Sequence, residues 1–256
     1  MNLLLLERAE VTGDPARPAA RISDRRAQHL REVLRVTPGA TVRAGIIGGA
    51  TGQATVVSDD GTTIELALEP VFDPALVAGA APEAPMPVDL VLAMPRPKVL
   101  SRALETAAAF GLRRVDIVNA WRVDKSYLDS PRLEAASITE HLRLGAEQGV
   151  TTHLPAVQLH PRLMPFLNEH HPAEGAPAST RLLAHARGAV PIEQAWRASP
   201  RTPITLAIGP EGGWIEREVE TFATRGFAVV TLGAPVLRCE VALAAALGQL
   251  ALLLRA

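Results

Sequence analysis

The residues with the clearest chemical potential form a glycine-rich loop between a predicted strand and a predicted helix. Residues 204–208 have the continuous apolar pattern of a strand, 209–213 (GPEGG) form the loop, and a helix is expected over 216–225. Such loops bring the backbone close to a ligand. This one lacks the Lys-Ser/Thr pair of a P-loop and the spacing of a dinucleotide loop, and Glu211 would repel a phosphate. The loop therefore favours a neutral or cationic ligand with amide and hydroxyl edges.

A second loop, 233–237 (GAPVL), follows a predicted strand over 228–232 and offers mainly backbone N–H and C=O groups. Such groups can pair with a flat heteroaromatic, such as adenine, in an apolar slot. Arg238 and Glu240 follow the loop and precede an apolar helix expected over 241–254. Because burying either charge alone is costly, the pair should face a cavity or solvent. Alternatively, the glycines form tight turns, Glu240 favours the helix dipole and Arg238 makes a structural ion pair.

Basic residues are concentrated near the N-terminus, although the whole chain is balanced at 26 Lys plus Arg against 27 Asp plus Glu. Residues 17–43 hold seven arginines but only Asp24 and Glu32 as carboxylates. The planar arginine fork suits bidentate phosphate contacts, so the segment is a candidate anion-binding patch. A solvated helix face or a coding bias toward arginine is the alternative. The candidate RNA-binding residues are Arg21, Arg25, Arg26, His29, Arg31, Arg35 and Arg43.

The histidines, the cysteine and the tryptophans give weaker indications of function. The histidines match no standard zinc spacing, so we expect no metal site. Cys239 beside Arg238 has no histidine nearby in the sequence, which favours a small core-facing thiol over a nucleophile. The tryptophans are expected to be packing anchors, although Trp214, directly after Gly213, could lean over a cofactor or a second subunit. The histidines concerned are His141, His153, His160, His170 and His171, and the other tryptophans are Trp121 and Trp196.

The elements before residue 70 predict a small β-rich domain. A strand over 3–6 comes first, and Ser23 can cap a helix that continues to Leu34. Three strands with turn signals between them follow, over 41–47, 53–58 and 63–68. Five prolines then interrupt an Ala- and Gly-rich stretch at 70–87, where we place a linker and the domain boundary.

The remainder alternates between strand and helix patterns, which predicts a parallel sheet covered on both faces. Strands are expected over 88–94, 114–119 and 180–184, in addition to the two strands before the loops. Helices are expected over 99–110 and 131–148. The helix over 241–254 is apolar around nearly its whole circumference, so it should be buried in a core or against a second subunit.

Composition excludes several classes of protein. With 48% hydrophobic and 21% charged residues, the 256-residue chain is not intrinsically disordered. Its apolar runs are shorter than a membrane span, and its first residues do not have a signal-peptide pattern. The single cysteine cannot form an internal disulfide, which favours a reducing compartment. We therefore expect a cytoplasmic protein.

Three motifs together resemble one family: HLREVLRVTPG at 29–39, GPEGGWIEREVE at 209–220, and LGAPVLRCE at 232–240 followed by an Ala-rich helix. They look like the ribosomal RNA small-subunit methyltransferase E family, SPOUT-class enzymes that methylate uracil N3 in 16S rRNA. The likeness extends from about residue 20 to the end of the sequence. It implies an α/β fold with a PUA-like β-barrel RNA-binding domain (1–72), a Pro/Ala-rich linker (73–87) and a methyltransferase domain with a deep trefoil knot (88–256). It also implies a homodimer, no metal, and 16S rRNA or the small ribosomal subunit as partner.

The resemblance also assigns site residues. S-adenosylmethionine would lie in the knot, and Arg238 and Glu240 would be the catalytic pair beside the target base. We hypothesise that Arg238 stabilises charge on a uracil carbonyl oxygen, while Glu240 orients Arg238 or accepts the N3 proton through water. The implied cofactor-binding residues are Leu183, Ala184, His185, Gly209, Glu211, Gly212, Gly213, Leu232, Gly233, Val236 and Leu237.

The chain also departs from the family pattern. Thr151 and His153 stand where the family has arginines, which removes positive charge where RNA could lie. Two further departures from the family's usual residues can be accommodated by packing. They are Cys239 with Val241, and Ala109 with Phe110. Two other functions stay open: methylation of another RNA base or of a ribose 2′-hydroxyl, and a non-catalytic RNA-binding or assembly role.

Overall fold

The computed structural model describes residues 1–14, 16–69, 84–174, 178–188 and 190–255. Their contacts form two units. The first consists of Met1–Pro85 with Arg143–Leu154, and the second of Met86–Leu142 with Pro155–Ala256. Most of the predicted linker lies outside the described residues, and its last two residues, 86 and 87, belong to a strand of the second unit. The return of 143–154 to the first unit has no counterpart in the sequence prediction, because the helical pattern continues through residue 143.

A six-stranded sheet in the order β1-β4-β5-β6-β3-β2 forms the first unit. β1 pairs with β4 in parallel and all other pairs are antiparallel. The predicted meander corresponds to β4–β6, but the β2–β3 hairpin was not predicted, because Gly13 and Pro18 break the alternating pattern. The strands are β1 (Leu4–Leu6), β2 (Val11–Asp14), β3 (Arg17–Ile22), β4 (Thr41–Ile46), β5 (Thr51–Asp59) and β6 (Ile64–Leu68).

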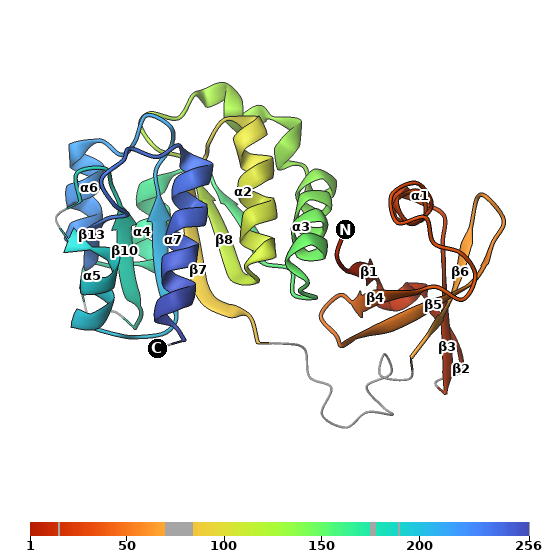
Figure 1. The fold of residues 1–256 in the computed structure, drawn as a ribbon. Helices are drawn as coiled ribbons and strands as arrows, with labels where there is room; N and C mark the ends of the chain where they lie inside the picture. The colour runs from red at the N-terminus through yellow and green to blue at the C-terminus, as the bar shows by residue number, and fades with distance from the viewer. Residues whose placement is uncertain (15, 70–83, 175–177, 189, 256) are drawn as a thin grey trace. The chain divides into compact units, whose positions relative to one another are not determined.

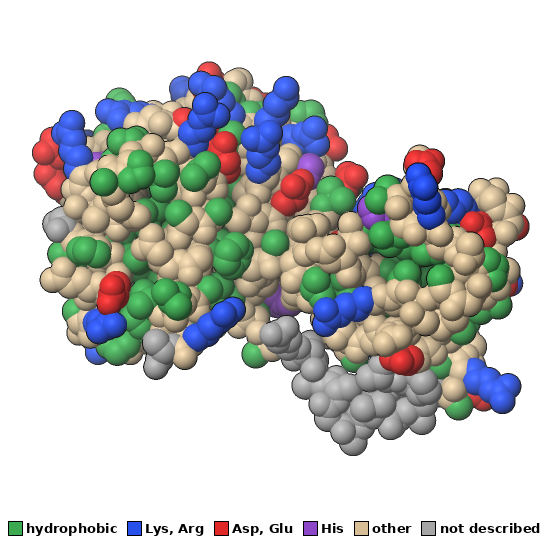
Figure 2. All heavy atoms as spheres, viewed as in Figure 1, with side chains coloured by type: hydrophobic (Ala, Val, Ile, Leu, Met, Phe, Trp, Pro, Cys, Tyr) green, Lys and Arg blue, Asp and Glu red, His purple; other side chains and the backbone are tan. Residues whose placement is uncertain are grey.

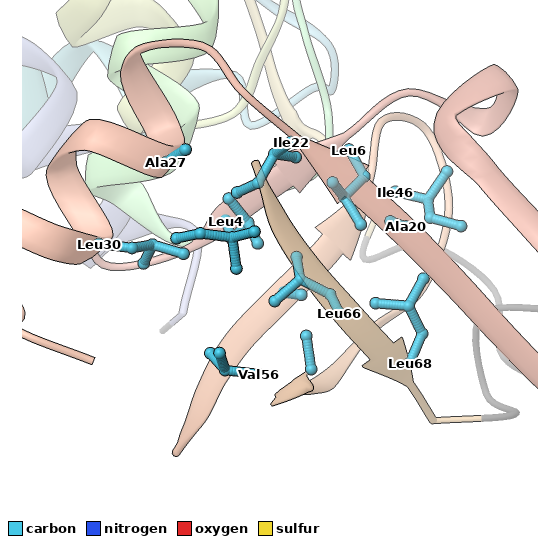
Figure 3. Packing of buried hydrophobic residues seen from close by; sticks show 13 residues of the cluster. Leu4, Leu6, Ala20, Ile22, Ala27, Leu30, Ile46, Val56, Leu66 and Leu68 are labelled. Carbon is cyan, nitrogen blue, oxygen red and sulfur yellow. The ribbon is translucent and has the colours of Figure 1, made fainter. Parts of the chain in front are cut away.

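Helix α1 (Arg25–Glu32) packs against this sheet through Ala27 and Leu30. Figure 3 shows these two side chains beside Leu4, in a core of leucine, isoleucine, valine and alanine from all strands except β2. Asp24 caps the helix by accepting the Arg26 backbone N–H, so the helix begins one residue later than Ser23 would place it. A 3-10 turn, η1 (Arg8–Glu10), connects β1 to β2.

The second unit contains a parallel sheet of seven strands in the order β11-β13-β10-β12-β7-β8-β9. Because both faces are covered, strands such as β12 are buried along their whole length, which explains their continuous apolar sequence. The strands are β7 (Met86–Ala93), β8 (Leu112–Val118), β9 (Ala156–His160), β10 (Thr180–Ala184), β11 (Val190–Pro191), β12 (Ile204–Ile208) and β13 (Phe227–Thr231).

Helices cover the parallel sheet, with α2 and α7 side by side on one face (Figure 1). The single helix predicted over 131–148 is in fact a 3-10 turn and an α-helix, because Glu134 has extended backbone. The helices are α2 (Pro97–Ala109), η3 (Lys125–Asp129), η4 (Pro131–Leu133), α3 (Ala135–Gly149), α4 (Leu163–His170), α5 (Ile192–Ala198), α6 (Glu216–Ala223) and α7 (Cys239–Leu253).

The apolar helix α7 buries one side of its surface, with Leu243, Leu247 and Leu250 inaccessible to solvent. Val241 and Leu252 on the same helix are exposed. The predicted burial of this helix is therefore found on one face. The other face is apolar and exposed to solvent. No helix among the described residues is long and apolar enough to cross a membrane.

Candidate active site

Three loops meet at the carboxyl edge of the parallel sheet. β10 lies between β12 and β13, so the chain leaves all three neighbouring strands at the same edge. The loops after Ala184, Ile208 and Thr231 line one cavity of about 700 Å³. Cavities of roughly 300–1,000 Å³ are typical of small-molecule sites. The loops singled out in the sequence thus come together in space.

Ten of the eleven predicted cofactor-binding residues line this cavity. The exception is Leu183, which lies inside β10 with its side chain fully buried. Side chains alternate between the two faces of a strand, so its neighbour Ala184 reaches the cavity where Leu183 does not. The ten lining residues are Ala184, His185, Gly209, Glu211, Gly212, Gly213, Leu232, Gly233, Val236 and Leu237.

The glycine-rich loop packs tightly around Trp214. A Cβ on Gly209 would lie 3.1 Å from both Cδ1 and Nε1 of the indole. Gly213 has a φ of +69° and its N–H donates to the Pro210 carbonyl at 2.8 Å, which closes the turn. The Trp214 side chain is buried, and its Nε1–H has no hydrogen-bond partner among the residues that the structure describes. The indole therefore packs closely beneath the glycine-rich loop.

Glu211 is fixed by the turn that begins α2. Its Oε1 accepts the backbone N–H of Arg96 at 2.9 Å. Glu211 therefore serves as a cap for a neighbouring segment as well as a cavity wall, and its negative charge is compatible with a cationic ligand.

The loop after β10 is held by backbone contacts. His185 donates its N–H to the Val230 carbonyl at 3.0 Å, and its Nδ1 accepts the Arg187 N–H at 3.1 Å. Burial and the nearby Arg187 lower the pKa of His185, which favours the neutral imidazole. Gly188 lies against β13, where a Cβ would be 2.2 Å from the Val230 carbonyl carbon.

The loop after β13 is more open. Gly233 has a φ of +134° and exchanges hydrogen bonds with the Thr231 hydroxyl, and Gln249 of α7 donates to the Leu232 carbonyl at 3.1 Å. Val236 is 83% exposed although it lines the cavity. This loop thus forms a rim whose apolar side chain faces water.

The predicted catalytic pair flanks the cavity. Arg238 is exposed at the N-terminal boundary of α7, and Glu240 is directed to Arg102 of α2, with 4.0 Å between Oε1 and Nη1. Cys239 between them lines the cavity, and burial together with Glu211 and Glu240 raises the pKa of its thiol to about 12. The thiol is therefore protonated at neutral pH, as expected for a structural cysteine.

Sequence reasoning missed Arg122 and Glu218. Arg122 lines the cavity, and its Nη1 donates to the carbonyl of Gly212. Glu218 is buried and accepts two backbone N–H groups, from Ile215 at 3.0 Å and from Trp121 at 2.8 Å. These residues join the loop after β8 to the glycine-rich loop. Only the position of Glu218 three residues after Ile215, where a capping carboxylate belongs, was visible in the sequence.

Most predicted RNA-binding arginines are already paired with carboxylates of the first unit. Arg26 is buried between Glu10 and Asp24, Arg25 makes a bidentate contact with Glu147, Arg21 contacts Glu65 and Arg31 contacts Asp59. His29 lies 3.4 Å from the N-terminal amine. Among the described residues, only Arg35 and Arg43 of the predicted set have no side-chain partner.

Two of the candidate histidines share a partly buried polar cluster. His160 Nε2 lies 2.7 Å from Asp116, which also contacts Arg114, and the His160 ring lies 5.5 Å from that of His170. Within the described ranges, no group of three His, Cys, Asp or Glu side chains is placed to hold a metal ion.

The chain is similar to known RNA-modifying proteins. Residues 82–251 match the model of the RNA methyltransferase domain family. The ribosomal RNA small subunit methyltransferase E of Treponema pallidum is 30% identical over 96% of this chain and 89% of its own length. A second such protein, from Borreliella burgdorferi, is 24% identical over 96% of this chain and 95% of its own length.

Solved structures share the fold. A Neisseria gonorrhoeae ribosomal RNA small subunit methyltransferase E bound to S-adenosyl methionine superposes with a TM-score of 0.72 at 22% identity, covering 99% of this chain and 98% of that one. A Legionella pneumophila methyltransferase in complex with the same cofactor gives 0.72 at 20% identity, covering 98% and 97%. The sequence match extends over nearly the whole chain and includes the three cavity loops. The chain therefore belongs to the ribosomal RNA small subunit methyltransferase E family.

Proposed function

We propose that this protein is an S-adenosylmethionine-dependent methyltransferase that modifies N3 of a uridine in 16S rRNA. The observation that carries the proposal is the convergence of the loops after β10, β12 and β13 on one cavity. Family membership and the names of the relatives support RNA as the substrate. The cytoplasmic location expected from the sequence remains a prediction.

The cavity residues fit the cofactor. The backbone groups of the loop after β13 can pair with the adenine edge. Glu211 places a negative charge where a sulfonium or ammonium group would be favoured. S-adenosylmethionine, when bound, supplies an activated methyl group to the nucleophile.

The protein's own contribution is to align the acceptor base and to manage one proton. Uracil N3 carries a proton at neutral pH, which must leave before N3 can act as a nucleophile. We assign Arg238 to stabilising negative charge on a uracil carbonyl oxygen, because its exposed guanidinium follows directly after the cavity loop. Glu240 is held near Arg102 rather than Arg238, so its proposed role is to accept the N3 proton through water.

The finer architecture is part of the same proposal. We infer that the second unit contains a deep trefoil knot, which the position of β10 between β12 and β13 and the likeness in fold support. The first unit would be a PUA-like RNA-binding domain formed mainly by residues 1–72. The exposed apolar side of α7, with Val241 and Leu252, supports a homodimer.

The test is methyl transfer from methyl-labelled cofactor to 16S rRNA and to small subunits that lack the modification, followed by nucleoside analysis. The expected product is 3-methyluridine. Label in another base or in a ribose 2′-hydroxyl would keep the enzyme class and overturn the acceptor. If calorimetry detects no binding of S-adenosylmethionine, the protein is a non-catalytic RNA-binding protein instead.

Substitution of Arg238 tests its assigned role. Arg238→Ala should reduce turnover about 100-fold or more, as loss of a charge-stabilising group does, with little change in cofactor affinity. Arg217→Ala, which removes an exposed arginine from α6, is the control and should retain activity. Equal losses of turnover and cofactor affinity in Arg238→Ala would show that Arg238 is only structural.

A further inference from the structure

Trp121 is an exposed aromatic side chain in the loop that follows β8. Its side chain is 79% exposed, whereas Trp214 is only 3% exposed. Water around so much apolar surface is unfavourable, and an exposed tryptophan in an ordered loop is a common mark of a binding residue. We propose that Trp121 is a platform on which an unpaired RNA base stacks beside the cavity. The proposal rests on the proposed function, because it assigns a recognition residue to the same substrate.

The loop that carries Trp121 is fixed to the cavity wall. The backbone N–H of Trp121 donates to Oε1 of Glu218 at 2.8 Å, and Oε2 of the same buried carboxylate accepts the N–H of Ile215 at 3.0 Å. The next residue, Arg122, donates to the Gly212 carbonyl. The indole is therefore exposed on a backbone that is tied to the glycine-rich loop, which is the preorganisation that a stacking platform requires.

The charges at this edge of the sheet favour a polyanion. Arg122 and Lys125 follow β8, Arg96 follows β7 and Arg238 follows β13, so all four lie at the carboxyl edge and all are exposed. None of the four forms a salt bridge within the described part of the chain. Lys and Arg side chains gather at this edge, where α2 and α7 begin, in Figure 2.

Two carboxylates at the same edge accept backbone N–H groups, and a third, Glu216 of α6, is exposed. Asp124 caps η3 by accepting the Ser126 N–H at 3.0 Å, and Glu211 accepts the Arg96 N–H. An unpaired base offers a flat face to the indole, while the RNA phosphates meet the four basic side chains, so the edge suits single-stranded RNA. Alternatively, Trp121 would lie in an interface with a second copy of the chain. The experiment below distinguishes an RNA base from a second subunit.

The experiment measures RNA binding by fluorescence anisotropy of a labelled 12-nucleotide oligouridylate, with the full chain and saturating S-adenosylmethionine. Three variants are compared with the natural sequence: Trp121→Leu, which keeps bulk but removes the π face, Trp121→Phe, which keeps a π face, and Met164→Ala. Met164 is an exposed apolar residue of α4 and serves as the control. Oligouridylate annealed to oligoadenylate serves as the paired probe.

Base–aromatic stacking corresponds to a loss of about 5- to 100-fold in affinity when the aromatic side chain is removed. We expect Trp121→Leu to weaken single-strand binding within that range, Trp121→Phe to restore most of it, and Met164→Ala to match the natural sequence. The paired probe should be insensitive to all three variants. Unchanged single-strand affinity in Trp121→Leu would overturn the proposal.

Two further measurements separate the possible failures. Calorimetry with S-adenosylmethionine should give the same dissociation constant for Trp121→Leu and the natural sequence, and absence of binding to both would sink the proposed function rather than the platform alone. Light scattering should give one oligomeric state for all variants. A change of that state in Trp121→Leu would assign Trp121 to a subunit interface and overturn the proposal.

Discussion

At the residue scale, Gly188 has no room for a side chain. A Cβ there would lie 2.2 Å from the carbonyl carbon of Val230 and 2.3 Å from the nitrogen of Thr231. Both are backbone atoms of β13, which cannot move aside as a flexible side chain would. Gly188→Ala should therefore displace the loop after β10, lower the melting temperature by several degrees and weaken binding of S-adenosylmethionine at least 10-fold.

Gly248 supplies the matched control. It is exposed on α7, and apart from the backbone of its own helix no atom of the described residues lies within 4 Å of its Cβ position. Alanine favours helix over glycine by about 1 kcal/mol, so Gly248→Ala should preserve or raise the melting temperature. Thermal unfolding followed by circular dichroism compares the two variants, and equal effects would contradict the steric argument.

Glu218 is the residue whose loss should loosen two loops at once. Glu218→Gln turns an amide NH2 group toward one of two backbone donors, so one of the N–H groups of Trp121 and Ile215 loses its acceptor. The cost of such an unpaired buried group is roughly 1–3 kcal/mol. Glu216→Gln, on the exposed side of the same helix turn, should cost much less. Urea unfolding measures both, and a similar free energy of unfolding for the two variants would disprove the bridging role.

The sequence predicts those site residues whose role depends on their neighbours along the chain. The glycine-rich loop and the segment 232–237 were recognisable because backbone and spacing define them. Glu218 and Arg122 act across loops that are about 90 residues apart along the chain, a distance that no local pattern spans. The family resemblance places the segment around Leu183 at the cavity but does not say which side chains point into it. The alternation of side chains along β10 decides that, and it buries Leu183 away from the cavity.

At the element scale, the arginines on α1 and on the strands and turn around it are mostly paired with carboxylates. Arg35 and Arg43 have no side-chain partner within the described residues, whereas Arg21 and Arg31 are paired with Glu65 and Asp59. Replacing Arg35 and Arg43 by serine should lower the salt slope of RNA affinity by about 0.7 for each phosphate that is no longer neutralised. The Arg21→Ser, Arg31→Ser double variant should leave the slope nearly unchanged. Anisotropy titrations at several salt concentrations decide this, and equal slopes for both double variants would remove Arg35 and Arg43 from the RNA interface.

The C-terminal end of α4 should make stability depend on pH. His171 packs edge-on against Phe227 at 5.4 Å, and burial, followed by the charges of Arg181 and His170, lowers its pKa to about 4. Asp116 opposes this shift and Arg114 adds to it. Since the folded-state pKa is below the unfolded value of about 6.5, the unfolded state binds the proton first as pH falls.

The free energy of unfolding should therefore fall as pH decreases from about 6.5 to 4, by roughly 1–2 kcal/mol after allowance for partial exposure. His171→Phe keeps a ring against Phe227 and removes the titrating group, so it should flatten this part of the curve. Urea unfolding at half-unit pH intervals tests the prediction. An unchanged slope in His171→Phe would assign the acid sensitivity to other groups.

Elements with a strong apolar pattern were the predictable ones. β10 and β12 have the predicted bounds, because buried parallel strands are mostly apolar along their length. The β2–β3 hairpin escaped prediction because Gly13 and Pro18 break its alternating pattern, and α4 escaped because eight residues carry little periodicity. The break at Glu134 was also invisible, because it depends on one backbone angle within a helix-forming sequence.

At the scale of the whole molecule, the first unit is completed by a segment far along the chain. The backbone carbonyl of Glu147 accepts the N–H groups of Asn2 and Leu3 at 3.1 and 3.0 Å, and its carboxylate holds Arg25. The Thr152 carbonyl accepts the Gly48 N–H at 2.8 Å, and the Thr152 hydroxyl donates to the Gly49 carbonyl at 2.7 Å. The proline-rich boundary near residue 80 therefore does not separate two independent folding units.

A fragment of residues 1–85 should consequently be unstable by itself. Without 143–154, the N–H groups of Asn2, Leu3 and Gly48 lose their acceptors and Arg25 loses its carboxylate. Each hydrogen bond contributes about 0.5–1.5 kcal/mol net, and loss of several of them is a large part of the stability of a domain this small.

The same fragment joined through a Gly/Ser linker to residues 135–154 should regain a cooperative thermal transition by circular dichroism. Glu147→Gln in the joined fragment should lower its melting temperature, because the amide cannot replace the buried carboxylate against Arg25. If the short fragment melts as cooperatively and at as high a temperature as the joined one, the later segment is dispensable and the first unit is defined by its own strands alone.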